Sequence, residues 1–484
     1  MKRFTAAVLA FAAAAAAGSI AAAEDKPVPL QRRVDAALDR PALAPAVWGV
    51  EVRNVRTGAV VYARNAGKNF KPASTLKVVT TAAALDAFGP DARFRTTVET
   101  AGRLDAGRIV GDIYLVGGGD PNLSGRFHDG RAIAPFEQLA DRLVAAGVLG
   151  IEGRVLGHDG LFAGERRGED WTWGDLVWCY GAEVSALALN DNCVDLTVAP
   201  GEREGDAVVI GASPTSSHYR VVSTATTIAR GVPGELRLER DLGGNVIRLS
   251  GTHAIGQSAW QGSVALEDPA RFAARVFGDV LISRGIKITG EAETIAGDLP
   301  ATRRVLAFLD SAPLSELITT INKKSQNLHT EMLLRLLGAR RGGVGSLETG
   351  REAIEEFLAR MGVPSDSWQL QDGSGLSRSD LITPRGMVAL LVAMDKHPHG
   401  AVFRASLPVA GVDGTLENRM RSGSAFRRVQ AKTGTIRNVN GLAGYATARN
   451  GDRLAFYAVI NHHTAEGSDA TAALDALAAV LAGS

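Results

Sequence analysis

The two ends of the chain carry matching strand and helix patterns, and a long stretch of different character separates them. Residues 47–66 alternate apolar and polar side chains, which predicts a β-hairpin, and an apolar helix follows Ser74. Residues 441–461 predict a second hairpin with an Asn-Gly turn, and an alanine-rich helix follows over 469–482. We therefore expect one α/β domain that is assembled from distant segments of the chain.

The pattern between the two ends changes twice. Residues 313–396 show apolar recurrence at three and four residues, which is typical of helices. The stretch before them is rich in Gly, Val and Thr, as in "GELRLERDLGGNVIRLSG", and predicts short strands and turns. We expect a domain of residues 24–89 and 300–484, and a large, mostly β insertion at 90–299 with two subdomains, 90–197 with 264–299, and 198–263.

The first residues, "MKRFTAAVLAFAAAAAAGSIAAAEDKP", have the features of an export signal. Lys2 and Arg3 precede an alanine-rich apolar stretch, and small residues lead up to Ala23. This predicts a signal peptide at residues 1–23, cleavage near Ala23 and a periplasmic location. No later uncharged apolar run is long enough to span a bilayer, so we expect no transmembrane anchor.

Composition and short motifs exclude several classes of function. With 484 residues, 45% hydrophobic composition and a net charge of +1, the chain is long enough for two or three cores and is not poised to bind nucleic acid. There is no C-x-x-C or H-E-x-x-H motif, and the triple glycine at 117–119 lacks the context of a phosphate-binding loop. We therefore expect neither a metal nor another cofactor.

Ser74 precedes Lys77 by three residues at the start of an apolar run, "STLKVVTTAAAL". On a helix the two side chains share one face, so the amine can reach the hydroxyl. The helix N-terminus and the apolar surroundings favour a neutral lysine, which is a base able to activate a serine nucleophile. The same spacing also fits a helix cap followed by a lysine that extends toward solvent.

Two further motifs favour the catalytic interpretation. Ser325-Gln326-Asn327 offers a second hydroxyl and a side-chain amide ahead of a helix, and Lys432-Thr433-Gly434 puts a cation and a hydroxyl on a strand that ends in glycine. The set S-x-x-K, S-D-N and K-T-G is that of penicillin-binding proteins and class A β-lactamases. All three motifs occur here in the required order.

The chain thus resembles the penicillin-recognising serine acyl enzymes, and the long gap between the first two motifs narrows the resemblance. It is similar to the class C low-molecular-mass penicillin-binding proteins of the penicillin-binding protein 4 type, the D-alanyl-D-alanine carboxypeptidase/endopeptidase family (peptidase family S13). The phrases "LVGGGDPNLS", "DGSGLSR" and "LPVAGVDGTLENR" extend the likeness over nearly the whole chain after the leader. The implied fold is a penicillin-binding/β-lactamase-like transpeptidase domain with an antiparallel sheet flanked by helices. Gln326 stands where the family commonly has Asp.

The resemblance implies a periplasmic enzyme that acts on the D-Ala-D-Ala end of peptidoglycan stem peptides and on cross-links, and that binds β-lactams covalently. Ser74 would attack the carbonyl of the penultimate D-alanine, and Lys77 would accept its proton. Ser325 and Asn327 would relay that proton and position the peptide, while Lys432 polarises Ser325.

The third motif and the inserted region are implied to bind substrate. Thr433 would help to hold the terminal carboxylate, Gly434 would allow close approach, and the backbone N–H groups of Ser74 and Thr435 would form the oxyanion hole. In the stretch "WTWGDLVWCY" we expect an exposed acid among aromatic rings. The residues that would bind the diaminopimelate side chain of the stem peptide are Asp175, Tyr180 and Arg378, with Arg437 as a further candidate.

Cys179 and Cys193 are the two cysteines of the chain, and an oxidising compartment makes a disulfide between them plausible. Two buried free thiols are the alternative. Three alternative functions also stay open: a β-lactamase, a secreted Ser-Lys esterase, and a catalytically silent wall-binding module. A homodimer is one oligomeric state that is compatible with the sequence.

Overall fold

The computed structural model describes residues 29–121 and 123–484. The predicted signal peptide, residues 1–23, lies outside the described residues. No helix in the described part of the chain combines the length and the apolar composition that crossing a membrane requires.

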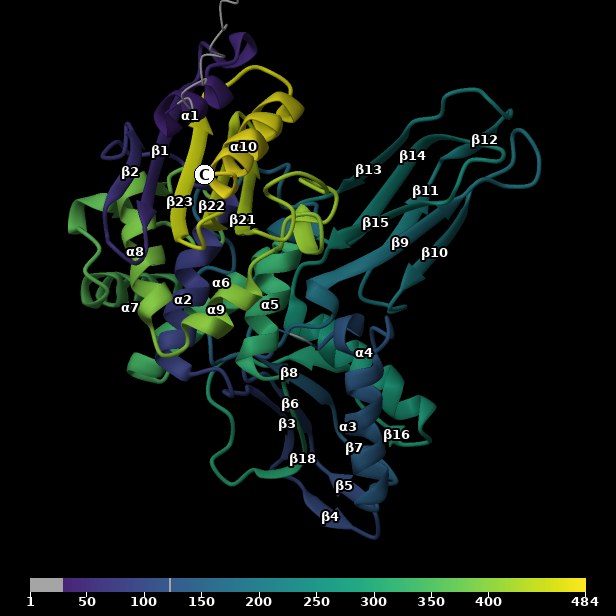
Figure 1. The fold of residues 1–484 in the computed structure, drawn as a ribbon. Helices are drawn as coiled ribbons and strands as arrows, with labels where there is room; N and C mark the ends of the chain where they lie inside the picture. Colours follow the sequence, from purple (N-terminus) through teal and green to yellow (C-terminus); the bar gives the residue numbers. More distant parts are fainter. Residues whose placement is uncertain (1–28, 122) are drawn as a thin grey trace, which may run out of the picture.

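A five-stranded antiparallel sheet joins the two ends of the chain, as the sequence predicts (Figure 1). Its first strand, β1 (Val47–Asn54), pairs with β2 (Val60–Arg64) on one side and with β23 (Arg453–Asn461) on the other. Strands β22 (Val439–Thr447) and β21 (Val429–Ile436) complete the sheet. The third motif lies on β21, at the edge of the sheet, and is thereby held in a fixed strand geometry.

Helices cover both faces of this sheet. On one face, α1 (Leu30–Leu38) packs with α10 (Gly467–Ala482) over an apolar core. On the other face a larger core contains α2 (Lys77–Phe88) and α8 (Pro384–Lys396). The remaining helices near this second core are α5 (Leu314–Lys324), α6 (Asn327–Gly342), α7 (Leu347–Arg360) and α9 (Gly400–Ser406). The sequence-based prediction of an α/β domain with an antiparallel sheet between helices is confirmed.

The first part of the inserted region contains two sheets and two helices. The helices are α3 (Ala134–Ala145) and α4 (Pro269–Ser283), and both are part of a second large core. One sheet has the order β17 (Ala292–Thr294), β8 (Val155–His158), β6 (Ile113–Val116), β3 (Arg95–Thr100) and β18 (Arg304–Asp310). The other has the order β16 (Lys287–Ile288), β7 (Gly150–Glu152), β5 (Arg108–Val110) and β4 (Arg103–Asp105). Strand β18 follows the boundary that we expected at residue 300, yet it pairs with β3 and so completes an inserted sheet.

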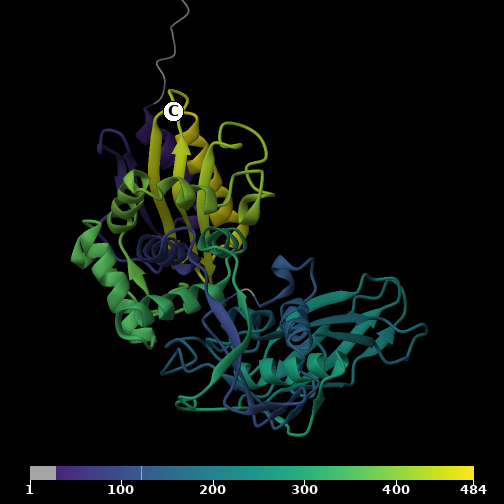
Figure 2. The ribbon, with the colours of Figure 1, turned by 90° about the horizontal axis from the view of Figure 1, so that it is seen from below.

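A second part of the insertion extends away from the rest of the molecule, and Figure 2 shows the two inserted parts beside each other below the main domain. This second part is built from β-strands in two sheets. One sheet consists of β10 (Val209–Ser213), β9 (Cys193–Ala199) and β15 (Trp260–Ala265). The other consists of β11 (Arg220–Ser223), β14 (Val246–Ala254), β12 (Thr226–Ile228) and β13 (Leu236–Arg240). A two-stranded sheet of β19 (Trp368–Gln369) and β20 (Leu381–Ile382) lies in the main domain.

Cys179 and Cys193 form a disulfide, with their Cα atoms 5.9 Å apart. The pairing that the sequence made plausible is therefore present, and the alternative of two free thiols is wrong. Cys193 begins β9 and is fully buried, and Cys179 packs against it within a small apolar cluster. The bond closes a loop that starts beside the predicted side-chain binding residues and ends at the inserted β sheet.

Candidate active site

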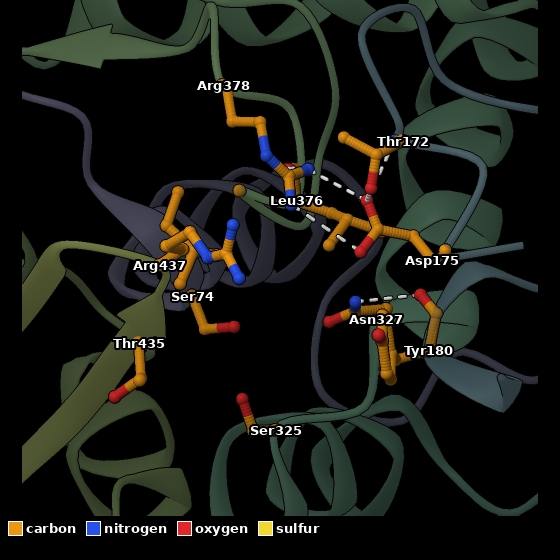
Figure 3. A pocket seen from close by; sticks show the side chains of 13 residues that line it. Ser74, Thr172, Asp175, Tyr180, Ser325, Asn327, Leu376, Arg378, Thr435 and Arg437 are labelled. Carbon is orange, nitrogen blue, oxygen red and sulfur yellow. Dashed lines mark hydrogen bonds and ion pairs between the residues drawn. The ribbon is translucent and has the colours of Figure 1, made fainter. Parts of the chain in front are cut away.

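Ser74 lies in a single 3₁₀ turn, Ala73–Leu76, directly before α2. The residue before it, Ala73, has φ of +48°, a left-handed conformation that costs a non-glycine residue free energy. Gly375 approaches this turn so closely that a Cβ atom there would lie 1.9 Å from the carbonyl oxygen of Ala73. The strained turn directs the Ser74 side chain into a cavity (Figure 3).

Lys77 is fully buried beneath Ser74, and its Nζ atom lies 2.9 Å from Ser74 Oγ. The amine also donates to Asn327 Oδ1 at 2.6 Å and to the carbonyl oxygen of Ser374 at 2.7 Å. Burial lowers the pKa of Lys77 to about 7, although nearby carboxylates act in the opposite direction. Ser74 makes no capping hydrogen bond, so the alternative of a helix cap followed by a solvent-directed lysine is wrong.

The second motif occupies the break between α5 and α6. Ser325 has φ of +59°, which ends α5, and Asn327 begins α6. The sequence placed the motif ahead of a helix, as observed, but the apolar periodicity runs through this point and does not show that α5 ends there. The left-handed turn places the Ser325 hydroxyl across the cavity from Ser74, and Asn327 between Lys77 and the inserted region (Figure 3).

Lys432 reaches Ser325 from strand β21. Its Nζ atom lies 2.9 Å from Ser325 Oγ and also donates to the carbonyl oxygen of Thr433. Full burial, together with the positive charge of Lys77, holds the pKa of Lys432 well below its usual range. The sequence suggested a cation at this position, but this environment favours a neutral amine, which can donate a hydrogen bond and accept a proton.

The cavity has a volume of about 670 Å³ and brings together most of the residues that the sequence singled out. Thr433 is an exception, because its hydroxyl donates to Thr415 Oγ1 at 2.8 Å and its side chain is not among those that line the cavity. Thr435 and Arg437, farther along the same chain segment, do line it. The lining residues are Ser74, Thr172, Gly174, Asp175, Tyr180, Ser325, Asn327, Gly375, Leu376, Arg378, Thr435, Ile436 and Arg437.

Asp175 and Arg378 face each other at the far side of the cavity and form an ion pair at 2.8 Å (Figure 3). Asp175 also accepts hydrogen bonds from the backbone N–H and the hydroxyl of Thr172. The carboxylate that we expected to be exposed is therefore buried, with only 6% of the residue accessible. Tyr180 is 44% exposed. Partial burial raises the pKa of its phenol most, and the negative charge of Asp175 raises this pKa further.

Three buried carboxylates behind Lys77 escaped the sequence analysis. Glu331 Oε1 accepts the backbone N–H groups of Gly373 and Ser374, and so fixes the carbonyl that binds Lys77. Asp372 shares the Ser374 N–H with Glu331 and accepts two further N–H groups of the same loop and the indole N–H of Trp171. Asp380 accepts the N–H groups of residues 371 and 372. A charged residue four positions after Asn327 in an apolar helix was a signal for Glu331, and the Asp-Gly-Ser-Gly phrase was one for Asp372.

Within residues 29–121 and 123–484, no cluster of three or more His, Cys, Asp or Glu side chains has a geometry that could hold a metal ion. The groups that meet in the cavity are hydroxyls, amines, an amide and one ion pair. A serine hydroxyl beside a buried amine of lowered pKa is an arrangement for nucleophilic catalysis.

Comparison with known proteins identifies the family. The sequence profile of the D-Ala-D-Ala carboxypeptidase 3 (S13) family matches residues 30–481. A D-alanyl-D-alanine carboxypeptidase from Actinomadura sp. (strain R39) is 35% identical over 467 residues, which cover 94% of this chain and 84% of that protein. D-alanyl-D-alanine carboxypeptidase DacB from Haemophilus influenzae is 26% identical over 421 residues, which cover 86% and 85% of the two chains.

Solved structures agree with this result. Penicillin binding protein 4 (dacB) from H. influenzae superimposes with a TM-score of 0.80 at 25% identity, covering 93% of this chain and 98% of that one. A structure of the same protein in complex with a β-lactam gives a TM-score of 0.75 at 23% identity, with the same coverage. The fold is thus the penicillin-binding/β-lactamase-like fold that the motifs implied, and the protein belongs to the D-Ala-D-Ala carboxypeptidase 3 (S13) family.

Proposed function

We propose that this D-Ala-D-Ala carboxypeptidase works through an acyl-enzyme on Ser74 and that it also cleaves peptidoglycan cross-links as a D,D-endopeptidase. The observation that carries the proposal is the 2.9 Å contact between Ser74 Oγ and the fully buried Nζ of Lys77. The leader sequence supports action in the periplasm, where peptidoglycan stem peptides are accessible.

Acylation requires a base for the Ser74 hydroxyl, and a neutral Lys77 meets this requirement. Lys77 takes the proton as Ser74 Oγ attacks the carbonyl carbon of the penultimate D-alanine, and a tetrahedral oxyanion forms. The backbone N–H groups of Ser74 and Thr435, which both line the cavity, would stabilise that charge by several kcal/mol, at about 2.7–4 kcal/mol for a single donor.

The leaving D-alanine needs a proton, and the second hydroxyl can deliver it. Ser325 gives its proton to the departing amine and regains the proton that Lys77 took from Ser74, which Lys432, with its Nζ 2.9 Å from Ser325 Oγ, can relay. The C–N bond then breaks and leaves an ester on Ser74. A water molecule hydrolyses this ester and regenerates the hydroxyl, with Lys77 again serving as the base.

β-Lactams mimic the D-Ala-D-Ala end, and H. influenzae penicillin binding protein 4, a protein of the same fold, has been solved with one bound. Fluorescent penicillin therefore tests the proposal. Stable labelling at one molecule per chain is the expected result, because Asp175 is the one carboxylate among the described residues that line the cavity, and it is held by Arg378. Rapid turnover would instead indicate a β-lactamase, and absence of labelling a silent wall-binding module or an esterase.

We propose further that the inserted region binds the diaminopimelate side chain of the stem peptide. The free end of that side chain carries an ammonium and a carboxylate, which complement Asp175 and Arg378. These two residues come from the insertion and from the main domain, and they already neutralise each other across the cavity. A bound zwitterion would add hydrogen bonds to both partners without leaving either charge unpaired.

Replacing Asp175 or Arg378 by alanine should lower kcat/KM for a diaminopimelate stem peptide by about tenfold or more, equivalent to about 1.4 kcal/mol. Penicillin, which lacks this side chain, should acylate both variants at nearly the parental rate. A lysine-containing stem peptide, which lacks the side-chain carboxylate, is the control substrate for Arg378→Ala. Parental kcat/KM for the diaminopimelate peptide in both variants would refute the proposed role of the insertion.

A further inference from the structure

Each residue of the second motif is held by a different part of the chain. Ser325 contacts Lys432 on β21, and Asn327 contacts Lys77 on α2. Gln326, the middle residue, donates from Nε2 to Asp191 Oδ2 at 2.8 Å. Asp191 belongs to the inserted region. The insertion therefore contacts the motif through Gln326, the residue of the motif that has no proposed role in the reaction itself.

Asp191 is the centre of a buried hydrogen-bond network. Its Oδ1 atom accepts from Nε2 of the fully buried His329 at 2.8 Å, and its Oδ2 atom accepts from Arg126 as well as from Gln326. Burial alone would raise the pKa of Asp191, but His329 and Arg126 outweigh it, so the pKa falls to about 2. The carboxylate is therefore ionised at any pH at which the protein works.

The backbone around Asp191 is held in an unfavourable conformation. Asn190, Asp191 and Asn192 have φ of +47°, +57° and +57°, three consecutive left-handed residues. The surroundings stabilise this turn, because the Asn192 side chain donates to the carbonyl oxygen of Glu183 at 2.7 Å, and Cys193 directly after it is in the disulfide. Such strain persists only where the surrounding contacts fix it, and it aims the Asp191 carboxylate at α6.

The other end of the disulfide loop also contacts the motif. Tyr180, next to Cys179, accepts a hydrogen bond on its carbonyl oxygen from Asn327 Nδ2 at 2.8 Å (Figure 3). The loop 179–193 therefore contacts Asn327 through Tyr180 near its first end and Gln326 through Asp191 near its other end. The disulfide joins these two ends directly. Ser325 sits beside them in a left-handed conformation that these contacts help to fix.

We propose that Asp191 is a positioning residue for catalysis: from the inserted region it holds Gln326, and through it sets the placement of Ser325 and Asn327 in the active site. This role rests on the proposed acyl-enzyme function. It also accounts for glutamine in place of the aspartate of an S-D-N motif, because an amide can donate to Asp191 whereas a second carboxylate would repel it.

Gln326→Glu is the sharpest test, because it preserves the shape of the side chain and sets a carboxylate against Asp191. Acylation by penicillin should slow by about tenfold or more, while the dissociation constant of the initial non-covalent complex stays the same. In the double variant Asp191→Asn/Gln326→Glu the amide and the carboxylate are exchanged. Arg126, whose side chain is 38% exposed, can turn to the new carboxylate, and acylation should recover most of the parental rate.

Asp195→Asn is the matched control, because Asp195 lines the same hollow as Asp191, but its side chain bonds to Asn190 and Ser263 and, within the described part of the chain, to no residue of the second motif. This variant should acylate at the parental rate. A Gln326→Glu variant as fast as the parent, or a double variant no faster than Gln326→Glu, would overturn the positioning role while the acyl-enzyme function stands. A parent protein that penicillin does not acylate would overturn both.

Discussion

Ser74→Ala should abolish covalent labelling by penicillin and the release of D-alanine from stem peptides, because the variant lacks the only atom in this account that bonds to the substrate carbonyl. The fold should persist. The Ser74 hydroxyl caps no helix, and its loss leaves Lys77 with two other hydrogen-bond acceptors, so the free energy of unfolding should change by about 1 kcal/mol or less. Thermal unfolding and gel fluorescence measure the two effects separately.

A Ser74→Ala variant that still accepts the label at the parental rate would show that another side chain is the nucleophile. Ser325 is the second serine among the described residues that line the cavity, so Ser325→Ala is the matched control. It should slow acylation without preventing it, since in the proposed mechanism Ser325 relays a proton and forms no bond to the carbonyl carbon.

Lys77→Met should slow acylation by about 10²–10⁴-fold, the usual contribution of a general base. Methionine fills a similar volume but accepts no proton, so the substitution removes the base from this fully buried position. The parent should show a matching pH dependence. Because the pKa of Lys77 is about 7, the neutral base predominates above this pH, and below it acylation should fall about tenfold for each pH unit.

The pH profile and the variant test the same group in independent ways. In Lys77→Met the residual rate should lose its rise through pH 7, whereas Arg437→Ala, at the exposed side of the cavity, should keep that rise. Parental acylation that stays flat from pH 5 to 9, or a Lys77→Met variant with the parental rate, would contradict the role of Lys77 as the base.

The sequence predicted those parts of the fold that local patterns determine. Alternation in β1, β2, β22 and β23 identified both hairpins, and their shared sheet followed from the position of the hairpins at the two ends of the chain. The break at Ser325 was not predictable in this way. Apolar residues of α5 and α6 continue in helical register across it, and contacts from Lys432 and Asp191, remote in sequence, decide the left-handed turn.

The helices α3 and α4 were missed in the sequence for a different reason. Each has buried apolar residues at helical spacing and a proline in its first turn, so the pattern was present in the sequence. The glycine-rich and valine-rich composition of the whole insertion concealed it. The region is mixed α/β on one side and all β on the other, and β18 closes it after residue 300.

The candidate catalytic residues could be identified in the sequence because each motif is short and its spacing reflects local geometry. The contacts that these side chains make with residues far away in the sequence were less predictable. Asp175 and Arg378 are 203 residues apart, and nothing local to Asp175 indicates that an arginine will bury its carboxylate. The same holds for Asp191, whose partners Arg126, Gln326 and His329 lie on other segments.

Mapping the acylated residue is the direct test of whether Ser74 is the nucleophile. The purified protein is incubated with penicillin and, separately, with a D-Ala-D-Ala stem peptide, quenched in acid, digested and analysed by tandem mass spectrometry. We expect one adduct per chain on the peptide that contains Ser74, with both compounds. An adduct on any other residue, or release of D-alanine with no acylated Ser74 at any quench time, would contradict it.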